Sequence, residues 1–150
     1  HYPEILKQIL SKPFKNVFLN TQAYIMEYEN PQDVLDEKPN LLLLKQWAQH
    51  QAKVTEPQVA LDLAITAQAA TAYDCVSRYF APANGIDEDP VTGSIHCAIA
   101  PLWAEKLGKS EILAYQASAR GGHLYCEVFE NERIEVSGYA KLYMQAELNF

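Results

Sequence analysis

Three carboxylates stand together in the middle of the sequence, directly before a short polar stretch. Asp87, Glu88 and Asp89 are followed by Pro90 and then by the small residues at 92–94. A carboxylate can exchange a proton with a bound substrate, and a helix that begins on small residues leaves its first N–H groups accessible to an anion. The segment therefore predicts an anion-binding helix N-terminus beside a carboxylate that has a role beyond solubility.

Asp89 is the candidate for the proton-handling group, and it has a plainer alternative role. Aspartate followed by proline is a common helix start, with Asp89 at the N-cap and Pro90 as the first helical residue. In the functional interpretation the carboxylate exchanges or positions a proton on the bound acid. Asp87 and Glu88 fit a solvated acidic edge better than a second catalytic group.

Gly93, Ser94 and Thr92 are the candidates for binding an anion at this helix end. A glycine lets a ligand approach the backbone closely, and a serine hydroxyl adds a donor. Thr92 and Ser94 would use the same atoms internally if they only capped the helix, so both interpretations stay open. His96, a lone histidine among apolar neighbours, is more typical of a satisfied core residue. Arg120, followed by two glycines, is more typical of a solvated turn than of an anion ligand.

A long apolar segment positions these residues. A helix is predicted from about Thr92 to Leu107, and because it is apolar on nearly every face it should be buried. Gly108 marks its C-terminal end. The fold class predicted is α+β, with a curled antiparallel, barrel-like sheet around this one central helix. The expected strands are 16–19, 23–28, 59–66, 73–80, 112–117, 123–129, 133–137 and 139–148, and the other helical segments are 3–10, 32–37 and 41–50.

Length and composition fit a single globular domain over residues 1–150. Apolar residues make up 49% and charged residues 21% of the chain, which is ordinary for such a domain. Twelve basic and nineteen acidic residues give a net charge of −7, so nucleic acid and anionic membranes are poor partners. No apolar run reaches the roughly 20 residues of a membrane span. We expect a cytoplasmic protein.

The cysteines and the missing motifs limit the chemistry. Cys75, Cys97 and Cys126 are odd in number and widely spaced, which predicts reduced, buried thiols rather than a disulfide framework or a zinc site. The sequence contains no G-x-x-x-x-G-K-[ST], G-x-G-x-x-G or H-E-x-x-H pattern. We therefore expect no metal and no cofactor.

Several motifs, in their order and spacing, resemble those of the PhzF-like (phenazine biosynthesis-type) isomerases. The resemblance covers most of the chain, but only the second, C-terminal domain of the two that the family has. It implies the diaminopimelate epimerase fold, with the active site in the cleft between the domains. The similar stretches are R-x-F-A-P from Arg78, EDPVTGS from Glu88, PLWAEKLGK from Pro101, YQASARGG from Tyr115 and IEVSGYA from Ile134.

The resemblance also implies a reaction, which is isomerisation by proton transfer on a small carboxylated substrate, without a cofactor, in a biosynthetic process. It places Asp89 in the active site and has Gly93 and Ser94 bind the substrate. In the family the principal acid/base is a glutamate of the first domain, and a glycine–histidine pair there also meets the substrate. No part of this chain corresponds to that domain. The two-thiol mechanism of epimerases with the same fold is disfavoured, because Asp-Pro-Val-Thr precedes Gly93 without a cysteine.

Two hypotheses of different classes follow. In the first, the chain is part of such an isomerase, and its start at His1 rather than methionine favours a piece of a longer protein. In the alternative it is a non-catalytic small-anion-binding or self-associating module without its catalytic half. The resemblance also implies that the alternating final strand, 139–148, crosses back to complete the first domain, so its end is expected to lack a partner within the chain. It would pair with the missing N-terminal domain or with a second copy in a homodimer.

Overall fold

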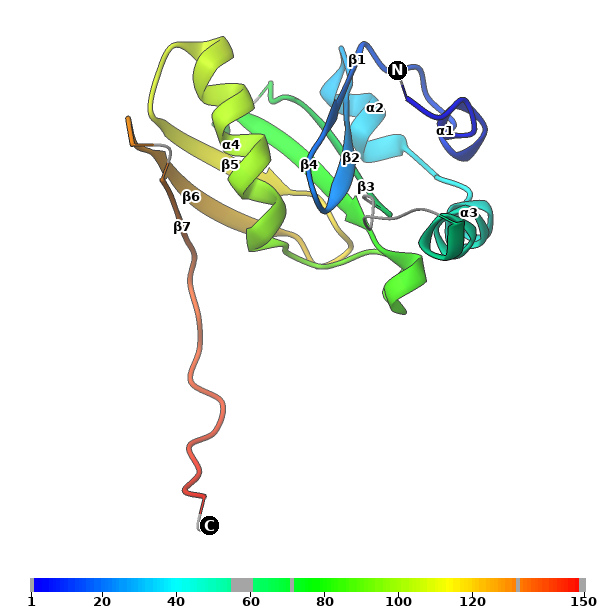
Figure 1. The fold of residues 1–150 in the computed structure, drawn as a ribbon. Helices are drawn as coiled ribbons and strands as arrows, with labels where there is room; N and C mark the ends of the chain where they lie inside the picture. The colour runs from blue at the N-terminus through cyan, green and yellow to red at the C-terminus, as the bar shows by residue number, and fades with distance from the viewer. Residues whose placement is uncertain (1, 55–60, 71, 132, 149–150) are drawn as a thin grey trace.

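The structure, a computed structural model, describes residues 2–54, 61–70, 72–131 and 133–148. Within them the chain forms a seven-stranded sheet in which the strands lie in chain order (Figure 1). The strands are β1 (Asn16–Leu19), β2 (Ala23–Glu27), β3 (Asp62–Gln68), β4 (Cys75–Phe80), β5 (Glu111–Gln116), β6 (Gly122–Val128) and β7 (Ile134–Ser137). The helices are α1 (Leu6–Ile9), α2 (Pro31–Asp36), α3 (Leu41–Val54) and α4 (Gly93–Leu107), with a 3₁₀ turn η1 (Pro82–Asn84).

Local sequence signals set the ends of several elements as predicted. β1 and β2 form the expected antiparallel hairpin. Asn40 caps α3, because its Oδ1 accepts the N–H of Leu43 at 3.0 Å. Gly108 follows α4 in the left-handed region, with φ 65°. This conformation ends the helix, and glycine adopts it readily because it has no Cβ.

The sheet is mixed, which corrects the prediction of an antiparallel barrel. β2 and β3 run parallel, as do β4 and β5, while the other neighbours are antiparallel. Parallel neighbours require a long crossover, and α2 with α3 supplies the first while α4 supplies the second. β1 and β7 are the two ends of the strand order, so the sheet does not close into a barrel.

Apolar layers cover both faces of the first half of the sheet. On one face α4 packs through Ile95, Ile99 and Trp103. On the other face α1, α2 and α3 contribute a second cluster that includes Leu6 and Leu44. Because both faces are covered, every position of β3 except the last is buried. The prediction of a core built around one helix therefore missed the second layer.

α4 is buried on one side rather than all round, and this corrects a second prediction. The sheet lies against one face of the helix without enclosing it, so Cys97 on the opposite face is exposed, whereas Cys75 and Cys126 are buried. All three cysteines are free, in agreement with the prediction of reduced thiols. No helix in the described ranges combines the length and the apolar character that crossing a bilayer demands.

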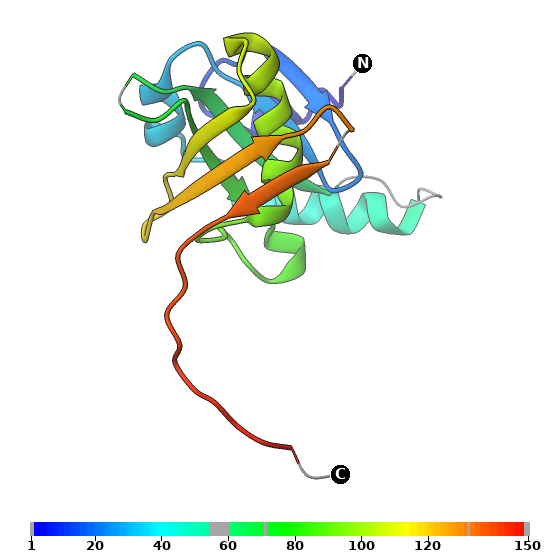
Figure 2. The ribbon, with the colours of Figure 1, turned by 90° about the vertical axis from the view of Figure 1, so that its left-hand side faces the viewer.

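After β7 the chain leaves the body of the molecule as an extended segment (Figures 1 and 2). Residues 139–148, predicted as a strand, form no ladder with any described part of the chain. Tyr139, Leu142 and Tyr143 are 91%, 81% and 97% exposed. We call residues 139–148 the C-terminal arm.

Candidate functional site

Arg78 of β4 fixes the acidic loop that ends at Asp89. Its Nε and Nη2 donate to the two carboxylate oxygens of Glu88, at 2.7 and 3.0 Å. Its Nη1 donates to the carbonyl oxygen of Glu37 at 2.7 Å. Such a bidentate pair sets orientation as well as adding stability. Glu88 is therefore a structural residue rather than the solvated edge that was predicted, while Asp87 is exposed as expected.

Asp89 lies in the turn before α4, and its carboxylate accepts a hydrogen bond from the hydroxyl of Thr92. Its backbone N–H donates to the carbonyl oxygen of Tyr79 at 3.0 Å. Because α4 begins at Gly93 with Thr92 as its N-cap, the alternative in which Asp89 and Pro90 start the helix is wrong. The carboxylate is oriented by Thr92 and is half-buried.

Gln116 of β5 holds the turn 89–92 from the side of the sheet. Its Nε2 donates to the Asp89 carbonyl oxygen at 2.7 Å and to the Thr92 hydroxyl oxygen at 3.1 Å, and its Oε1 accepts the Thr92 N–H at 2.8 Å. The side chain is fully buried. Sequence reasoning did not single it out. The available signal was alternation, because Gln116 shares the buried side of its strand with Ile112 and Ala114, where a polar group needs partners.

The N-terminus of α4 carries no side-chain cap, because the Thr92 hydroxyl is engaged with Asp89. Gly93 and Ser94 are exposed, and a Cβ added at Gly93 would meet no heavy atom within 4 Å. The first N–H groups of a helix have no partner inside the helix. Here they lie under exposed residues at the positive end of the helix dipole.

A pocket of 520 Å³ opens beside this helix end. Gly93 and Arg120 both line it, and Arg120 is exposed as predicted for a turn arginine. Gly122 lets β6 approach the turn 89–92, because a Cβ at that position would lie 2.1 Å from the side chain of Val91. The glycine therefore sets how closely β6 and the helix end can pack.

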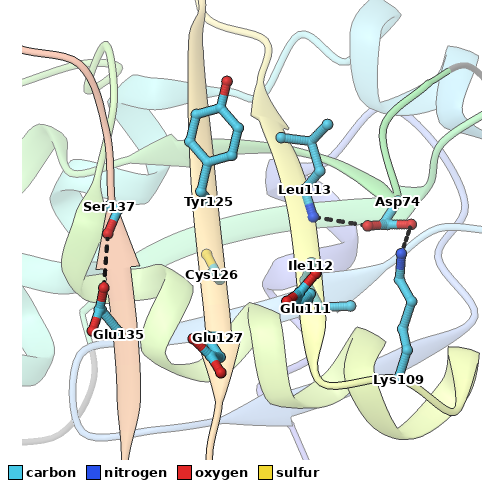
Figure 3. A pocket seen from close by; sticks show the side chains of 10 residues that line it. All are labelled: Asp74, Lys109, Glu111, Ile112, Leu113, Tyr125, Cys126, Glu127, Glu135 and Ser137. Carbon is cyan, nitrogen blue, oxygen red and sulfur yellow. Dashed lines mark hydrogen bonds and ion pairs between the residues drawn. The ribbon is translucent and has the colours of Figure 1, made fainter.

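A second pocket lies on the sheet face opposite α4, and its charge does not suit a carboxylated ligand. The strand register sets Glu111, Glu127 and Glu135 directly opposite one another, and Figure 3 shows them side by side across β5, β6 and β7. Lys109 in the same pocket is paired with Asp74 at 2.6 Å. We call the three residues the glutamate row. In the parts of the chain that the structure describes, no group of three His, Cys, Asp or Glu residues is arranged to hold a metal ion.

Ser94 has a long-range partner that sequence reasoning missed. Nε2 of Gln22, in the turn between β1 and β2, lies 3.0 Å from Ser94 Oγ, although 72 positions separate the two residues. The same Nε2 lies 2.7 Å from the hydroxyl of Tyr79. A glutamine in a polar turn gives no sequence signal for such a contact.

Known proteins with similar sequences and structures share this fold. The model of the phenazine biosynthesis-like protein family (PhzC-PhzF) matches residues 6–146. An uncharacterised isomerase of Halalkalibacterium halodurans is 40% identical over 129 residues, which are 86% of this chain and 44% of that protein. A putative PhzC/PhzF protein from Clostridium difficile superposes with a TM-score of 0.80 at 34% identity, over 100% of this chain and 53% of the other.

A PhzF-family protein from Enterococcus faecalis gives a TM-score of 0.73 at 28% identity, over 95% of this chain and 53% of that one. The chain spans less than half the length of the curated relatives it matches and about half of these two solved chains. The family match covers nearly the whole chain. The chain therefore belongs to the phenazine biosynthesis-like family.

Proposed function

We propose that the chain is part of a PhzF-like isomerase that transfers a proton on a small carboxylated substrate without a cofactor. The family match and the curated relatives named as isomerases support the reaction class. The observation that carries the proposal is the uncapped N-terminus of α4 with the Asp89 carboxylate bound to Thr92 beside it. One turn thus offers donors for an anion and a carboxylate for a proton.

Each group in the turn has a role in this proposal. The N–H groups of the first turn of α4 and the hydroxyl of Ser94 bind the substrate carboxylate, and Arg120 adds positive charge from the neighbouring pocket. Asp89 takes up or returns the proton while the hydroxyl of Thr92 keeps its carboxylate oriented. The second acid/base comes from outside this chain, from a domain that faces it across a cleft.

An NMR titration of the isotope-labelled chain with sulfate and with acetate tests the anion site. The amides of Gly93 and Ser94 should shift saturably, and a ligand at ten times its Kd should add about 1.4 kcal/mol of stability. The start of α3 is the matched control, because Asn40 already accepts the N–H of Leu43 there. No shift at α4, or equal shifts at both helix starts, contradicts the site.

The variant Asp89→Asn tests the acid/base role. Asparagine keeps the size of the side chain and still accepts from Thr92, so the free energy of unfolding should change by less than about 1 kcal/mol. Turnover by the enzyme that contains this chain should fall about 100-fold or more, the usual scale for a positioned proton-transfer group. Asp87→Asn removes the same charge at an exposed neighbour and should leave turnover unchanged. Full activity of Asp89→Asn leaves that residue a structural role alone.

A non-catalytic module is the second candidate function, and the exposed C-terminal arm favours its self-associating form. This module would bind small anions at α4 without converting them. The result expected of it is sulfate binding at α4 together with no turnover by the unmodified protein that contains the chain.

A further inference from the structure

A chain of hydrogen bonds links the exposed hydroxyl of Ser94 to a buried carboxylate at the start of β3. Gln22 Nε2 lies 3.0 Å from Ser94 Oγ and 2.7 Å from the hydroxyl oxygen of Tyr79. That hydroxyl lies 2.6 Å from Asp62 Oδ2, and Asp62 is 7% exposed. The bonds thus join the β1–β2 turn, β3, β4 and the start of α4.

The direction of each bond follows from the protons available. Both carboxylate oxygens of Asp62 accept, one from the amide of Asn84 at 3.1 Å and the other from Tyr79. Burial and the bond to Asp62 raise the pKa of Tyr79. The hydroxyl therefore stays protonated and donates a hydrogen bond to Asp62. The oxygen of Tyr79 must then accept from Gln22, which turns the amide nitrogen of Gln22 toward Tyr79 and Ser94.

Both protons on the Gln22 nitrogen are then in use, so Ser94 Oγ is an acceptor in this chain and its own proton is left to donate. A helical serine often donates to the carbonyl four residues earlier. That bond is not formed here, and the carbonyl oxygen of Pro90 accepts instead from the hydroxyl of Ser118 at 2.7 Å. Among the described residues the Ser94 hydroxyl makes no second hydrogen bond. The Ser94 hydroxyl can therefore donate a hydrogen bond to a ligand at the N-terminus of α4.

We propose that Asp62, Tyr79 and Gln22 position Ser94 as a hydrogen-bond donor to the bound anion. The inference rests on the proposed function, because that function assigns the anion to this helix end. It also narrows the ligand class. With Ser94 and the backbone N–H groups all donating, the group bound there carries acceptors alone, as a carboxylate does and a carboxamide does not. Gln22 and Tyr79 are positioning residues that act through Ser94.

The variant Gln22→Glu reverses the direction of the hydrogen bond between residue 22 and Ser94. The side chain keeps almost the same size and shape. The introduced carboxylate accepts from Ser94, which turns the serine proton away from the ligand. Sulfate affinity, measured from the amide shift of Gly93, should fall about tenfold or more. Thr21→Glu is the matched control, because it adds the same charge at an exposed position of the same turn and keeps the Gln22 amide. Its loss of affinity should be clearly smaller.

Two further readouts distinguish positioning from a merely structural role. Ser94→Ala should weaken sulfate binding in the unmodified chain but cost nothing further in Gln22→Glu, because the donor is already lost there. Mild acid should restore much of the sulfate affinity of Gln22→Glu, because the introduced carboxyl group can donate once it is protonated. If Gln22→Glu does not fold, Gln22→Met keeps the shape without polar atoms. Gln22→Met should lower the sulfate affinity less than Gln22→Glu does. Ser94→Ala should still weaken sulfate binding when it is combined with Gln22→Met.

The outcomes separate this inference from the function it rests on. Equal sulfate affinity of Gln22→Glu and Thr21→Glu overturns the positioning role and leaves the anion site intact. Additive losses for Gln22→Glu and Ser94→Ala overturn it as well. Failure of the unmodified chain to bind sulfate at the Gly93 amide overturns the anion site, and the positioning role with it.

Discussion

His96 shows how a histidine close to a proposed active site can be purely structural. It is 0% exposed, and its ring nitrogens lie 2.7 Å from the Thr92 carbonyl oxygen (Nδ1) and 3.2 Å from Ser77 Oγ (Nε2). A carbonyl oxygen only accepts, so Nδ1 carries the proton and Nε2 accepts from Ser77. The prediction of a satisfied core residue is confirmed. His96 ties the first turn of α4 to β4 and thereby steadies the site.

The same contacts make stability depend on pH. Burial lowers the pKa of His96, against the opposing effect of its bond to Thr92. The folded protein therefore holds the ring neutral where the unfolded chain, with a pKa near 6.5, takes up a proton. Stability is present above that pH and is lost as the pH falls below it, by up to about 1.4 kcal/mol per pH unit.

Urea unfolding between neutral and mildly acidic pH measures this effect. In His96→Gln the overall stability should be lower, but the part of the pH slope that His96 causes should disappear. Identical slopes in both proteins would mean that His96 does not supply the titration.

At the scale of elements, the glutamate row destabilises the sheet on the face that α4 does not cover. Glu111, Glu127 and Glu135 are cross-strand neighbours, and all three are exposed. Like charges directly opposite one another weaken strand pairing. The antiparallel pairs β5–β6 and β6–β7 therefore hold together despite this row, through the apolar contacts that their other face makes with α4.

Glu127→Gln should stabilise the protein. It removes both repulsions of the row at once, which is worth about 0.2–1 kcal/mol for each pair. The gain should shrink at high salt, because exposed charges are screened. Thermal unfolding at low and high salt measures it, with Glu130→Gln, an exposed glutamate outside the row, as the control. An equal effect of the two variants would show that only net charge matters.

The elements that the sequence predicts well are those with local causes. The β1–β2 hairpin and the stop at Gly108 depend on a few neighbouring residues. The parallel pairings depend on where the crossover helices return the chain, which no local pattern records. The prediction of a wholly antiparallel, barrel-like sheet was therefore wrong, although most strands were found and the pairs β5–β6 and β6–β7 are antiparallel as predicted.

The same division holds inside the candidate site. The segment from Asp89 to Ser94 was found because its residue types are contiguous. The roles of Gln22 and Gln116 were not predicted, because their hydrogen-bond partners lie far away along the chain, at separations of 72 and 24 positions. Contacts of this kind follow from strand order and register, which become visible only in the folded molecule.

At the scale of the whole molecule, the C-terminal arm is an exposed surface that the described chain does not cover. Its apolar residues Leu142, Met144 and Leu148 are 81%, 72% and 76% exposed, and they alternate with Lys141, Gln145 and other polar residues along an extended backbone. Exposed extended segments of this kind readily pair with another strand. We propose that the arm pairs with another domain or with a second copy.

The chain by itself should therefore form a two-fold symmetric dimer through this arm. Removing residues 143–150 should give a monomer, and light scattering on both proteins measures the change. Replacing Leu142 and Met144 by serine should have the same effect, whereas replacing Lys141 and Gln145 should not. A monomer whose mass is unaffected by the truncation contradicts the prediction.

The order of the strands bears on how the chain folds while it is being made. Because β1 to β7 lie side by side in chain order, each pairing joins two strands that leave the ribosome one after the other. The antiparallel pairings close short loops, whereas the two parallel pairings wait for a helical crossover and are the slower closures. The sheet can therefore grow from its first hairpin, with each finished edge acting as the template for the next strand, and β7 is added last.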